Sequence, residues 1–383
     1  MSEHGVLLVG AKRTHQMSHA EVFGANPKCR LVAVASERGD PEGRAALYQE
    51  LADDLGIPYI PDLDEALARD DVDIVSSTPM VERRGLVAEK CLDAGKHVYL
   101  DKPLAGSVKD LDTIVAATER NDVRAQMFTL NLSGWVQEAR RAVAEGRIGE
   151  LRAIHAENVF AKGRAGSVPK GTVRSESEAT GRFTHLEAKR EMFDVGIYGL
   201  GFVHAVTGLK AESVYAHTGN YFFAEHLGAG VEDFGAMAMG LEGGVTATVI
   251  AGRFGWMSHP QSGPQKIVVV GSEGTLTFDA FRPRIELYNN EPDFVQPAVD
   301  PYDPMGMWGA SHEAYSPMPK QRWAAMPGPN TMALDVAEFV DCIEEGREPA
   351  VSPRVAASLT EVILGAYVSA ARGEEVRLPL PRG

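Results

Sequence analysis

The sequence predicts two domains: an α/β domain with a doubly wound parallel sheet, then an α+β domain with an open, mostly antiparallel sheet. A chain of 383 residues is long enough to form two hydrophobic cores. Up to about residue 130, continuous apolar runs alternate with helix-like segments, as in βαβ units. Beyond that point, β-prone runs lie close together and are separated by hairpin glycines. We therefore expect domains at residues 1–130 and 131–383.

The first part of the chain alternates buried strands with helices. Strands that are buried on both faces form continuous apolar runs, and those expected are Gly5–Gly10, Leu31–Ala35, Asp71–Ser77, Val98–Leu100 and Arg124–Thr129. The helices expected between them include Leu63–Arg69, Val81–Ala94 and Val108–Asn121. Because crossovers between parallel strands are right-handed, these elements form one doubly wound sheet.

The second part begins with a helix at Val136–Gly146 and a strand at Leu151–Phe160. The polar segment Ala161–Lys189 is more typical of a loop over a site, and a helix at Glu191–Thr207 follows it. Five strands are then expected at Ser213–His217, Phe234–Gly240, Val245–Ala251, Ile267–Val270 and Thr275–Phe278, with hairpin glycines between two pairs of them. The proline-rich stretch Asn289–Asn330 is expected to be a long loop, and helices at Met332–Gly346 and Ala356–Gly373 close the chain.

The composition excludes several classes of protein. A net charge of −15 argues against nucleic-acid binding, which requires a basic face. Cys29, Cys91 and Cys342 are widely spaced, so neither a disulfide framework nor a metal site is expected. The N-terminus lacks the apolar core of a signal peptide, and no apolar run has the length of a membrane span. We expect a cytoplasmic protein without membrane or nucleic-acid partners.

The stretch Ala94–Ala105, AGKHVYLDKPLA, contains the strongest candidate for a site. Asp101 and Lys102 directly follow a short apolar strand, and the carboxyl ends of parallel strands are where open α/β sheets bind ligands. Pro103 restricts Lys102 and should hold it in an extended conformation. A salt bridge at a strand end with a turn proline is the simpler interpretation of these three residues alone.

The loop after the first strand stands where a dinucleotide fingerprint would lie. Of the GxGxxG glycines only Gly10 is present, and Lys12 and His15 occupy the other two positions. A helix N-terminus here still offers N–H groups to a phosphate, to which Lys12 and Arg13 add charge. A purely structural turn remains open. After the second strand, Ser36, Glu37 and Arg38 give conflicting signals, because an acid suits a ribose diol whereas Ser and Arg suit a 2′-phosphate.

A second candidate site lies in EMFDVGIYGLG at Glu191–Gly201. Asp194 and Tyr198 are four residues apart, so a helix puts them on one face, where they could form a proton relay if a nearby cation lowers the tyrosine pKa. A buried tyrosine that is hydrogen-bonded to an aspartate is the structural alternative. His155, His185 and His204 lack metal-ligand spacing and are expected to be structural or exposed.

Together these segments resemble the Gfo/Idh/MocA oxidoreductases, the family of glucose-fructose oxidoreductase and inositol dehydrogenase. The resemblance runs nearly end to end: LVAVAS, DVDIVSSTP, LDAGKHVYLDKPLA, GRIGELRAI, MFDVGIYGL, GSEGTLTFD and AYVSAARGEEVRLPL follow in the family's order. It implies a Rossmann-type first domain and a hydride transfer between a nicotinamide cofactor and a substrate. Lys102 takes the place of the lysine that contacts both nicotinamide and substrate hydroxyl, and Asp194 with Tyr198 corresponds to the acid and the His or Tyr of the second domain.

The resemblance implies a set of site residues. The catalytic residues would be Lys102, Asp194 and Tyr198. The cofactor would meet Gly10, Lys12, Arg13, Thr14, Ser36, Glu37, Arg38, Thr78, Pro79, Arg83, Asp101 and Lys102. The substrate would meet Lys102, Asn131, His185, Lys189, Arg190, Asp194 and Tyr198.

Several positions depart from the family pattern. Two fingerprint glycines are absent, Ser36 replaces the usual acid, Asp101 replaces the usual glutamate, and Arg83 stands where a histidine is usual. Gly201 stands where an aspartate often follows the catalytic pair. These departures concern cofactor affinity and choice rather than the fold.

The sequence thus predicts an NAD(P)-dependent dehydrogenase or reductase that acts on a secondary alcohol or ketone of a sugar, cyclitol or glycoside. Of the two cofactors, NADP is slightly favoured, because Lys12, Arg13 and Arg38 would surround one phosphate. The alternatives are a redox-assisted glycosidase that retains its cofactor and a non-catalytic sensing regulator of the same fold. We expect a homodimer or homotetramer, because an open sheet leaves one partly apolar face uncovered.

Overall fold

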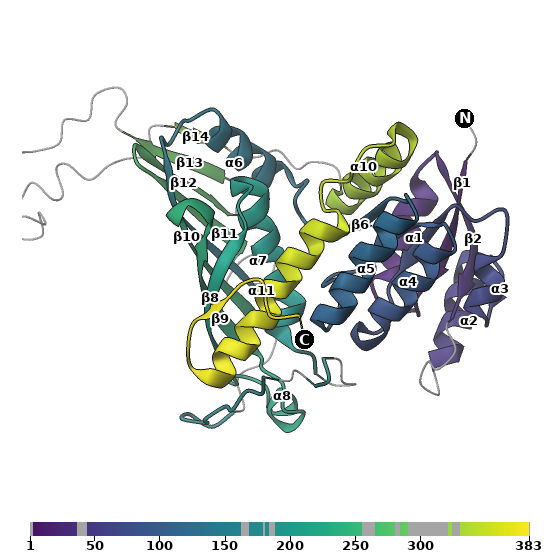
Figure 1. The fold of residues 1–383 in the computed structure, drawn as a ribbon, viewed down its shortest axis with the longest axis horizontal. Coiled ribbons are helices and arrows are strands. Elements are labelled where there is room, and N and C mark those ends of the chain that lie inside the picture. The colour runs from purple at the N-terminus through teal and green to yellow at the C-terminus, as the bar shows by residue number, and fades with distance from the viewer. Residues whose placement is uncertain are drawn as a thin grey trace, which may run out of the picture.

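The computed structural model describes residues 3–36, 44–161, 168–178, 181–183, 188–254, 265–279, 284–289, 321–323 and 330–382. These residues form two sheets, and helix α11 (Pro353–Arg372) runs between them (Figure 1). It contacts helix α5 (Val108–Arg120) of the first sheet's layer and helix α7 (Glu191–Thr207) of the second. By length and composition α11 is apolar enough to span a membrane, but most of it is buried, as in a core helix.

The first sheet, sheet A, has six parallel strands in the order β3-β2-β1-β4-β5-β6. Its strands are β1 His4–Val9, β2 Cys29–Ala35, β3 Tyr59–Ile60, β4 Ile74–Ser77, β5 His97–Leu100 and β6 Ala125–Met127. Helices α1 Gln16–Ala25, α2 Arg44–Leu55, α3 Leu63–Leu67, α4 Arg84–Asp93 and α5 connect them. The order reverses between β1 and β4, and such a reversal marks the edge where doubly wound sheets bind ligands. The predicted doubly wound sheet is therefore confirmed.

The second sheet, sheet B, has nine strands in the order β14-β13-β12-β11-β7-β10-β9-β8-β15. They are β7 Leu151–Ala161, β8 Ala211–Gly219, β9 Phe234–Leu241, β10 Thr246–Phe254, β11 Gln265–Gly271, β12 Gly274–Asp279, β13 Arg284–Asn289, β14 Gln321–Trp323 and β15 Val376–Arg377. Among its described pairs only β7 and β10 are parallel. The mostly antiparallel sheet expected for the second half is confirmed.

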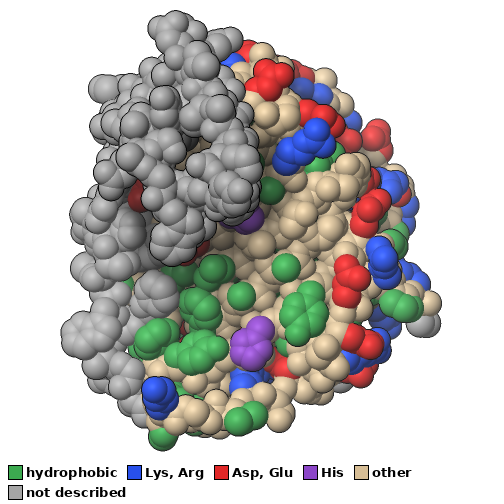
Figure 2. Space-filling model, turned by 90° about the vertical axis from the view of Figure 1, so that its left-hand side faces the viewer, with side chains coloured by type: hydrophobic (Ala, Val, Ile, Leu, Met, Phe, Trp, Pro, Cys, Tyr) green, Lys and Arg blue, Asp and Glu red, His purple; other side chains and the backbone are tan. Residues whose placement is uncertain are grey.

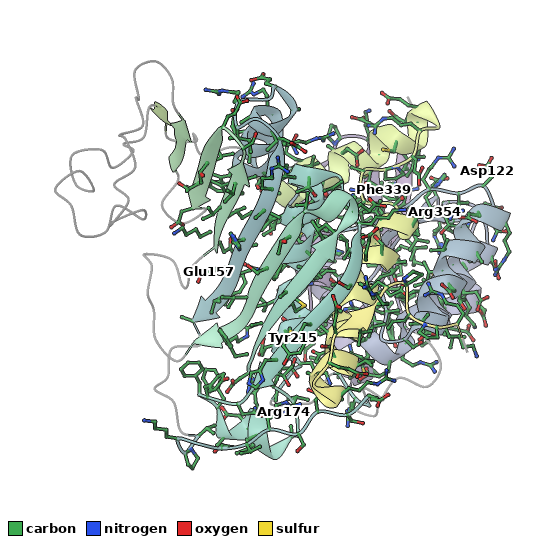
Figure 3. All side chains as sticks on the ribbon, turned by 60° about the vertical axis from the view of Figure 1, so that its left-hand side comes forward. Asp122, Glu157, Arg174, Tyr215, Phe339 and Arg354 are labelled. Atoms are coloured by element: carbon green, nitrogen blue, oxygen red, sulfur yellow. The ribbon has the colours of Figure 1, made fainter. Side chains whose placement is uncertain are left out.

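One face of sheet B packs against α7, next to helix α6 (Gly134–Ala144). The approach is close, because a Cβ on Gly199 would lie 2.7 Å from a methyl carbon of Val249 on β10. The glycines of α7 therefore let its backbone sit directly on the sheet, and the helix ends at Gly208 with φ 71°. The opposite face of the sheet is turned away from α7, and Tyr215 and Glu157 lie on it (Figure 3).

Helix α10 (Thr331–Glu345) returns to sheet A although it lies far along the chain. Val336, Phe339 and Val340 are fully buried in one cluster with residues of β1, α1 and β5. The phenol of Tyr99 on β5 donates a 2.7 Å hydrogen bond to Asp335, which Gln126 on β6 also contacts. The first core thus takes part of its cover from beyond residue 130.

Several expected elements differ in detail. The helix expected at Val81–Ala94 is divided into a 3-10 turn at Val81–Arg83 and α4. The loop expected at Asn289–Asn330 falls largely outside the described residues, but β14 lies within it. β3, β13, β14, β15 and helix α8 (Ala224–Gly228) were not expected, because elements of two to six residues contain too few periods of a pattern.

Candidate active site

Asp101 and Lys102 directly follow β5 at the carboxyl edge of sheet A, as expected. The backbone N–H of Asp101 donates to the carbonyl of Ser77 at the end of β4, over 3.0 Å, and this bond aligns the ends of the two strands. The Lys102–Pro103 peptide bond is cis. Both side chains are buried, so their charges require partners.

Lys102 finds its partner in the second half of the chain. Its Nζ donates to Asp194 twice, to the main-chain carbonyl over 2.5 Å and to the carboxylate Oδ1 over 2.9 Å. The same ammonium lies 4.6 Å from the centroid of the Tyr198 ring. Asp194 and Tyr198 share one face of α7, as their spacing predicts. The structure therefore brings the three residues predicted to be catalytic into one cluster.

The charges of this cluster are strongly coupled. Burial opposes the charge of Lys102, but Asp194, Tyr198 and Asp101 together outweigh it and raise the lysine pKa above its ordinary value. Burial would raise the pKa of Asp194, whereas Lys102 and then Lys189 lower it below the usual range. Burial raises the pKa of Tyr198, and the nearby ammonium offsets this only in part. A proton relay through Tyr198 requires a nearby cation to lower the tyrosine pKa, and this pKa is instead raised. The cluster therefore consists of an ammonium, a carboxylate and a neutral phenol.

Asp101 is held by the side chains of His15 and Arg84. His15 Nδ1 lies 2.7 Å from Oδ1, and the Arg84 guanidinium donates to Oδ2 over 2.6 Å. Arg84 also donates to the carbonyls of Pro103 and Pro79, so it ties together the loops after β4 and β5. Burial would raise the pKa of Asp101, but the charge of Arg84 holds it well below its usual range.

The expected nucleotide loop lies between β1 and α1, next to β4. A Cβ on Gly10 would lie 2.0 Å from the hydroxyl oxygen of Thr78, so only glycine fits there. Thr14 accepts from or donates to Thr78 over 3.2 Å, and Arg13 is exposed with φ 67°. This close backbone approach at the start of a helix fits a dinucleotide pyrophosphate. Arg13 and Thr14 would lie beside it.

Two cofactor candidates already have protein partners. Lys12 Nζ lies 2.6 Å from Asp54 and 3.6 Å from Glu50 on α2, so its charge is paired. Ser36 shares a 2.8 Å hydrogen bond with the phenol of Tyr59. Glu37 and Arg38 lie outside the described residues. Arg83, expected to meet the cofactor, ends the 3-10 turn, and the next residue, Arg84, begins α4 and contacts Asp101.

The expected substrate residues divide into two groups. Lys189 is exposed and close enough to Asp194 to lower its pKa, and Asn131 is buried with Oδ1 3.0 Å from the Cβ position of Gly201 on α7. Arg190 lies elsewhere. Its guanidinium contacts Glu176 over 3.0 Å and Glu232 over 3.3 Å, so it belongs to a buried ion-pair network. His185 lies outside the described residues.

Sequence analysis missed Arg253 at the end of β10. Its Nε donates to Glu191 over 2.6 Å, and its Nη2 lies 3.6 Å from Asp194 Oδ2. A signal was present, since Ala247, Val249 and Ala251 alternate along β10 as buried residues and Arg253 continues their parity. Strand alternation thus puts Arg253 on the face that meets α7.

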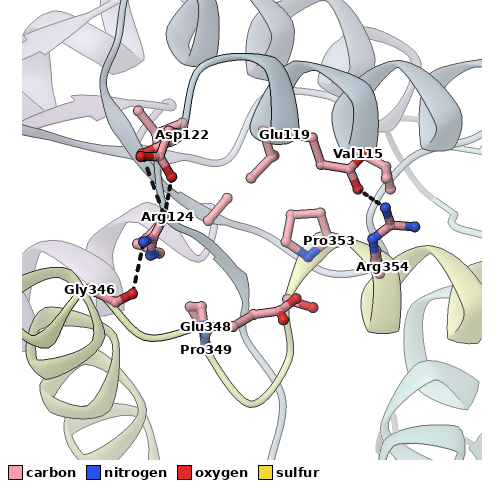
Figure 4. A pocket seen from close by; sticks show the side chains of 13 residues that line it. Val115, Glu119, Asp122, Arg124, Gly346, Glu348, Pro349, Pro353 and Arg354 are labelled. Carbon is pink, nitrogen blue, oxygen red and sulfur yellow. Dashed lines mark hydrogen bonds and ion pairs between the residues drawn. The ribbon is translucent and has the colours of Figure 1, made fainter.

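A cavity of about 340 Å³ lies at the other end of sheet A (Figure 4). It opens where β6 begins, between the end of α5 and the connection from α10 to α11. Arg124 bonds to Asp122 and to the carbonyl of Gly346, and Arg354 pairs with Glu119, so the arginines in view already have partners. The cavity therefore lies apart from the cluster around Lys102.

Comparison with known proteins agrees with this geometry. Residues 4–129 match the oxidoreductase family, NAD-binding Rossmann fold, and residues 136–277 match the GFO/IDH/MocA C-terminal domain. The chain is 28% identical over 292 residues to the dTDP-3,4-didehydro-2,6-dideoxy-alpha-D-glucose 3-reductase of Streptomyces violaceoruber, covering 73% of this chain and 76% of that one.

Solved structures share the fold over almost the whole chain. The aldose-aldose oxidoreductase of Caulobacter crescentus, complexed with glycerol, superposes with a TM-score of 0.71 at 20% identity and covers 98% of this chain and 100% of that one. The WlbA dehydrogenase of Bordetella pertussis, in complex with NADH and UDP-GlcNAcA, gives 0.73 at 18% identity and covers 99% of each chain. With both family domains matched in order and the lysine, aspartate and tyrosine gathered at the sheet edge, the chain is an oxidoreductase of the Gfo/Idh/MocA family.

Proposed function

We propose that the protein transfers a hydride between a nicotinamide cofactor and a secondary alcohol or ketone of a sugar, cyclitol or glycoside. The observation that carries the proposal is the Lys102 ammonium, which is buried at the carboxyl edge of sheet A and held by Asp194 beside Tyr198. The sugar-related names of relatives, such as the dTDP-sugar reductase, support the substrate class.

Lys102 would bind the reacting oxygen. An ammonium has three N–H donors, and Asp194 accepts two of them, so one remains for a substrate oxygen. This donor stabilises the negative charge that develops on the substrate oxygen when a ketone is reduced. The ammonium can also donate its proton to that oxygen, which gives the alcohol. Asp194 keeps the ammonium charged and oriented, and Tyr198 limits where the oxygen can sit. The bound nicotinamide supplies or accepts the hydride.

The cofactor would lie along the β1–α1 loop, with Gly10, Arg13 and Thr14 next to its pyrophosphate. The family model supports a nicotinamide dinucleotide. The slight preference for NADP rested on three cations, and the pairing of Lys12 with Asp54 removes one of them. The preference now depends on Arg13 and Arg38. Calorimetric titration of the wild type and Arg38→Ala with both dinucleotides tests it, and tighter NAD⁺ binding with unchanged NADP⁺ affinity in the variant would overturn it.

We also infer a division near residue 130, a cytoplasmic location and a homodimer or homotetramer formed through sheet B. In the described part of its outer face, hydrophobic side chains lie among uncharged polar side chains and backbone (Figure 2), and Tyr215 is 49% exposed. Such a broad face commonly marks an interface. Light scattering at micromolar protein concentration tests this, and a monomer would contradict it.

The central test is a substrate scan. Sugars, polyols and their keto forms are offered with each nicotinamide cofactor, and absorbance of the reduced cofactor is followed, while mass spectrometry identifies any cofactor that copurifies. Turnover of at least one such substrate, lost in Lys102→Met, is the expected result. If no member is turned over and neither cofactor binds at millimolar concentration, the proposal is wrong.

A further inference from the structure

Arg253 lies next to the proposed catalytic cluster, and the described residues leave part of its guanidinium without a hydrogen bond. Glu191 takes its Nε–H, and Asp194 lies 3.6 Å from Nη2, which is longer than a hydrogen bond. Nη1 makes no hydrogen bond to any residue that the structure describes, and the side chain is 27% exposed. The guanidinium carbon of Arg253 lies 5.9 Å from the centroid of the Phe160 ring, which contacts the guanidinium in a cation–π arrangement. Within the described part of the chain, Arg253 therefore keeps N–H donors that a ligand could accept.

The local charges leave an excess of cations. Asp194 is shared between Lys102 and Arg253, and Glu191 is shared between Arg253 and the buried His226, whose Nε2 lies 3.0 Å away. Lys189 is exposed and close enough to Asp194 to lower its pKa, and it has no ion pair to the described residues. Among the described residues, Lys102, Arg253 and Lys189 thus supply three permanent cations around the carboxylates of Asp194 and Glu191, so an incoming anion would balance the charge.

We propose that Arg253, assisted by Lys189, binds a carboxylate of the substrate, so that the substrate is a sugar acid or hydroxy acid rather than a neutral sugar. The inference rests on the proposed function, because it assumes that the reacting carbon lies at Lys102. The planar fork of arginine matches a carboxylate with two parallel N–H donors, which fixes orientation as well as affinity. Asp194, between the two cations, then separates the acid group from the reacting oxygen.

The test compares matched pairs of probes that differ in one carboxylate. D-glucuronate is compared with D-glucose, and D-galacturonate with D-galactose, by calorimetric binding to cofactor-saturated protein and by turnover. The acid member of at least one pair should bind more tightly. In Arg253→Gln its dissociation constant should rise about 10- to 100-fold, because a hydrogen bond to a charged group is lost, while the neutral member is unchanged.

Two further variants separate the possible causes. Arg253→Lys keeps the charge but not the fork, so it should restore only part of the acid affinity. Lys109→Gln on α5 removes one exposed cation that lies outside the cluster, and it should change nothing. If Arg253→Gln lowers turnover of acid and neutral probes equally, the residue only positions Asp194 and the inference is wrong. It is equally wrong if no acid binds better than its neutral partner.

Failure of this inference can be distinguished from failure of the proposed function. Turnover of neutral sugars that disappears in Lys102→Met, without any acid preference, would leave the proposed function standing and remove the inference alone. Tight acid binding that persists in Lys102→Met without turnover in the wild type would support the anion site and contradict the oxidoreductase mechanism.

Discussion

Two buried clusters of charge in this protein use the same residue types but differ in what they leave unsatisfied. In the cluster around Lys102, an ammonium and Arg253 retain donors that the described residues do not use. In the cluster of Arg174, Glu176, Arg190 and Glu232, the arginines contact both glutamates, Asn220 and the carbonyl of Gly230. Tyr367 closes the second cluster with a 2.6 Å bond to Glu232. Burial and charge alone thus do not indicate a functional site. Hydrogen-bond donors that the described residues leave unused distinguish the cluster around Lys102.

The largest effect that we expect is a loss of turnover when the cluster around Lys102 is changed. Lys102→Met should lower turnover by about 10²- to 10⁴-fold, or about 3–5 kcal/mol in the barrier, because it removes the donor to the reacting oxygen. Steady-state kinetics on the best substrate of the scan, with circular dichroism as a check of folding, measures this. Activity within about threefold of wild type would remove Lys102 from the mechanism.

The matched change in the second cluster should affect stability instead. Arg174→Met leaves Glu176 buried with one cation fewer, and we expect the free energy of unfolding to fall by about 3–5 kcal/mol. Denaturant titration measures the loss, and adding Glu176→Gln should restore part of it. A variant of normal stability but reduced kcat would contradict the structural role of this cluster.

A third buried acid gives a pH-dependent prediction. Burial raises the pKa of Asp335 to about 7, with the bonds from Tyr99 and Gln126 opposing the shift. Because the folded state then binds a proton that the unfolded state releases near pH 4, stability falls as pH rises from about 4 to 7. Asp335→Asn should flatten this decline and leave the protein more stable than wild type at pH 8. Melting temperatures across this range test it, and parallel curves for the two proteins would refute it.

The smallest effect concerns the phenol. Tyr198→Phe should cost about tenfold in kcat/KM, less than the loss of Lys102, because the ammonium still binds the reacting oxygen. Tyr215→Phe, on the outer face of sheet B, is the matched control and should leave kinetics unchanged. An unaltered Tyr198→Phe enzyme would show that the tyrosine takes no part in the reaction.

Elements and residue pairs with a local sequence pattern could be predicted. Contacts between residues far apart in the chain could not. The strands of sheet A and the pair Asp194 and Tyr198 follow from periods of two and 3.6 residues. His15 looked like a misfit in a nucleotide loop, yet it closes on Asp101 86 positions later in the chain, a contact that no local pattern encodes. Arg84 was not singled out, because no local pattern shows that the first residue of α4 reaches Asp101 17 positions later in the chain. Arg190 has the charge expected of a substrate residue, and only the tertiary structure shows that Glu176 and Glu232 are its ion-pair partners.

The return of α10 to sheet A has a consequence for the order in which the protein can mature during synthesis. β6 ends at Met127 and α10 begins at Thr331, so about 200 residues separate the first sheet from the helix that covers Tyr99 and Phe23. At ribosomal rates of about 5–20 residues per second, that interval lasts about 10–40 seconds. During this time the emerging first domain exposes the apolar surface that Phe339 later fills, so the nascent chain should be a client of holding chaperones until its last helices emerge.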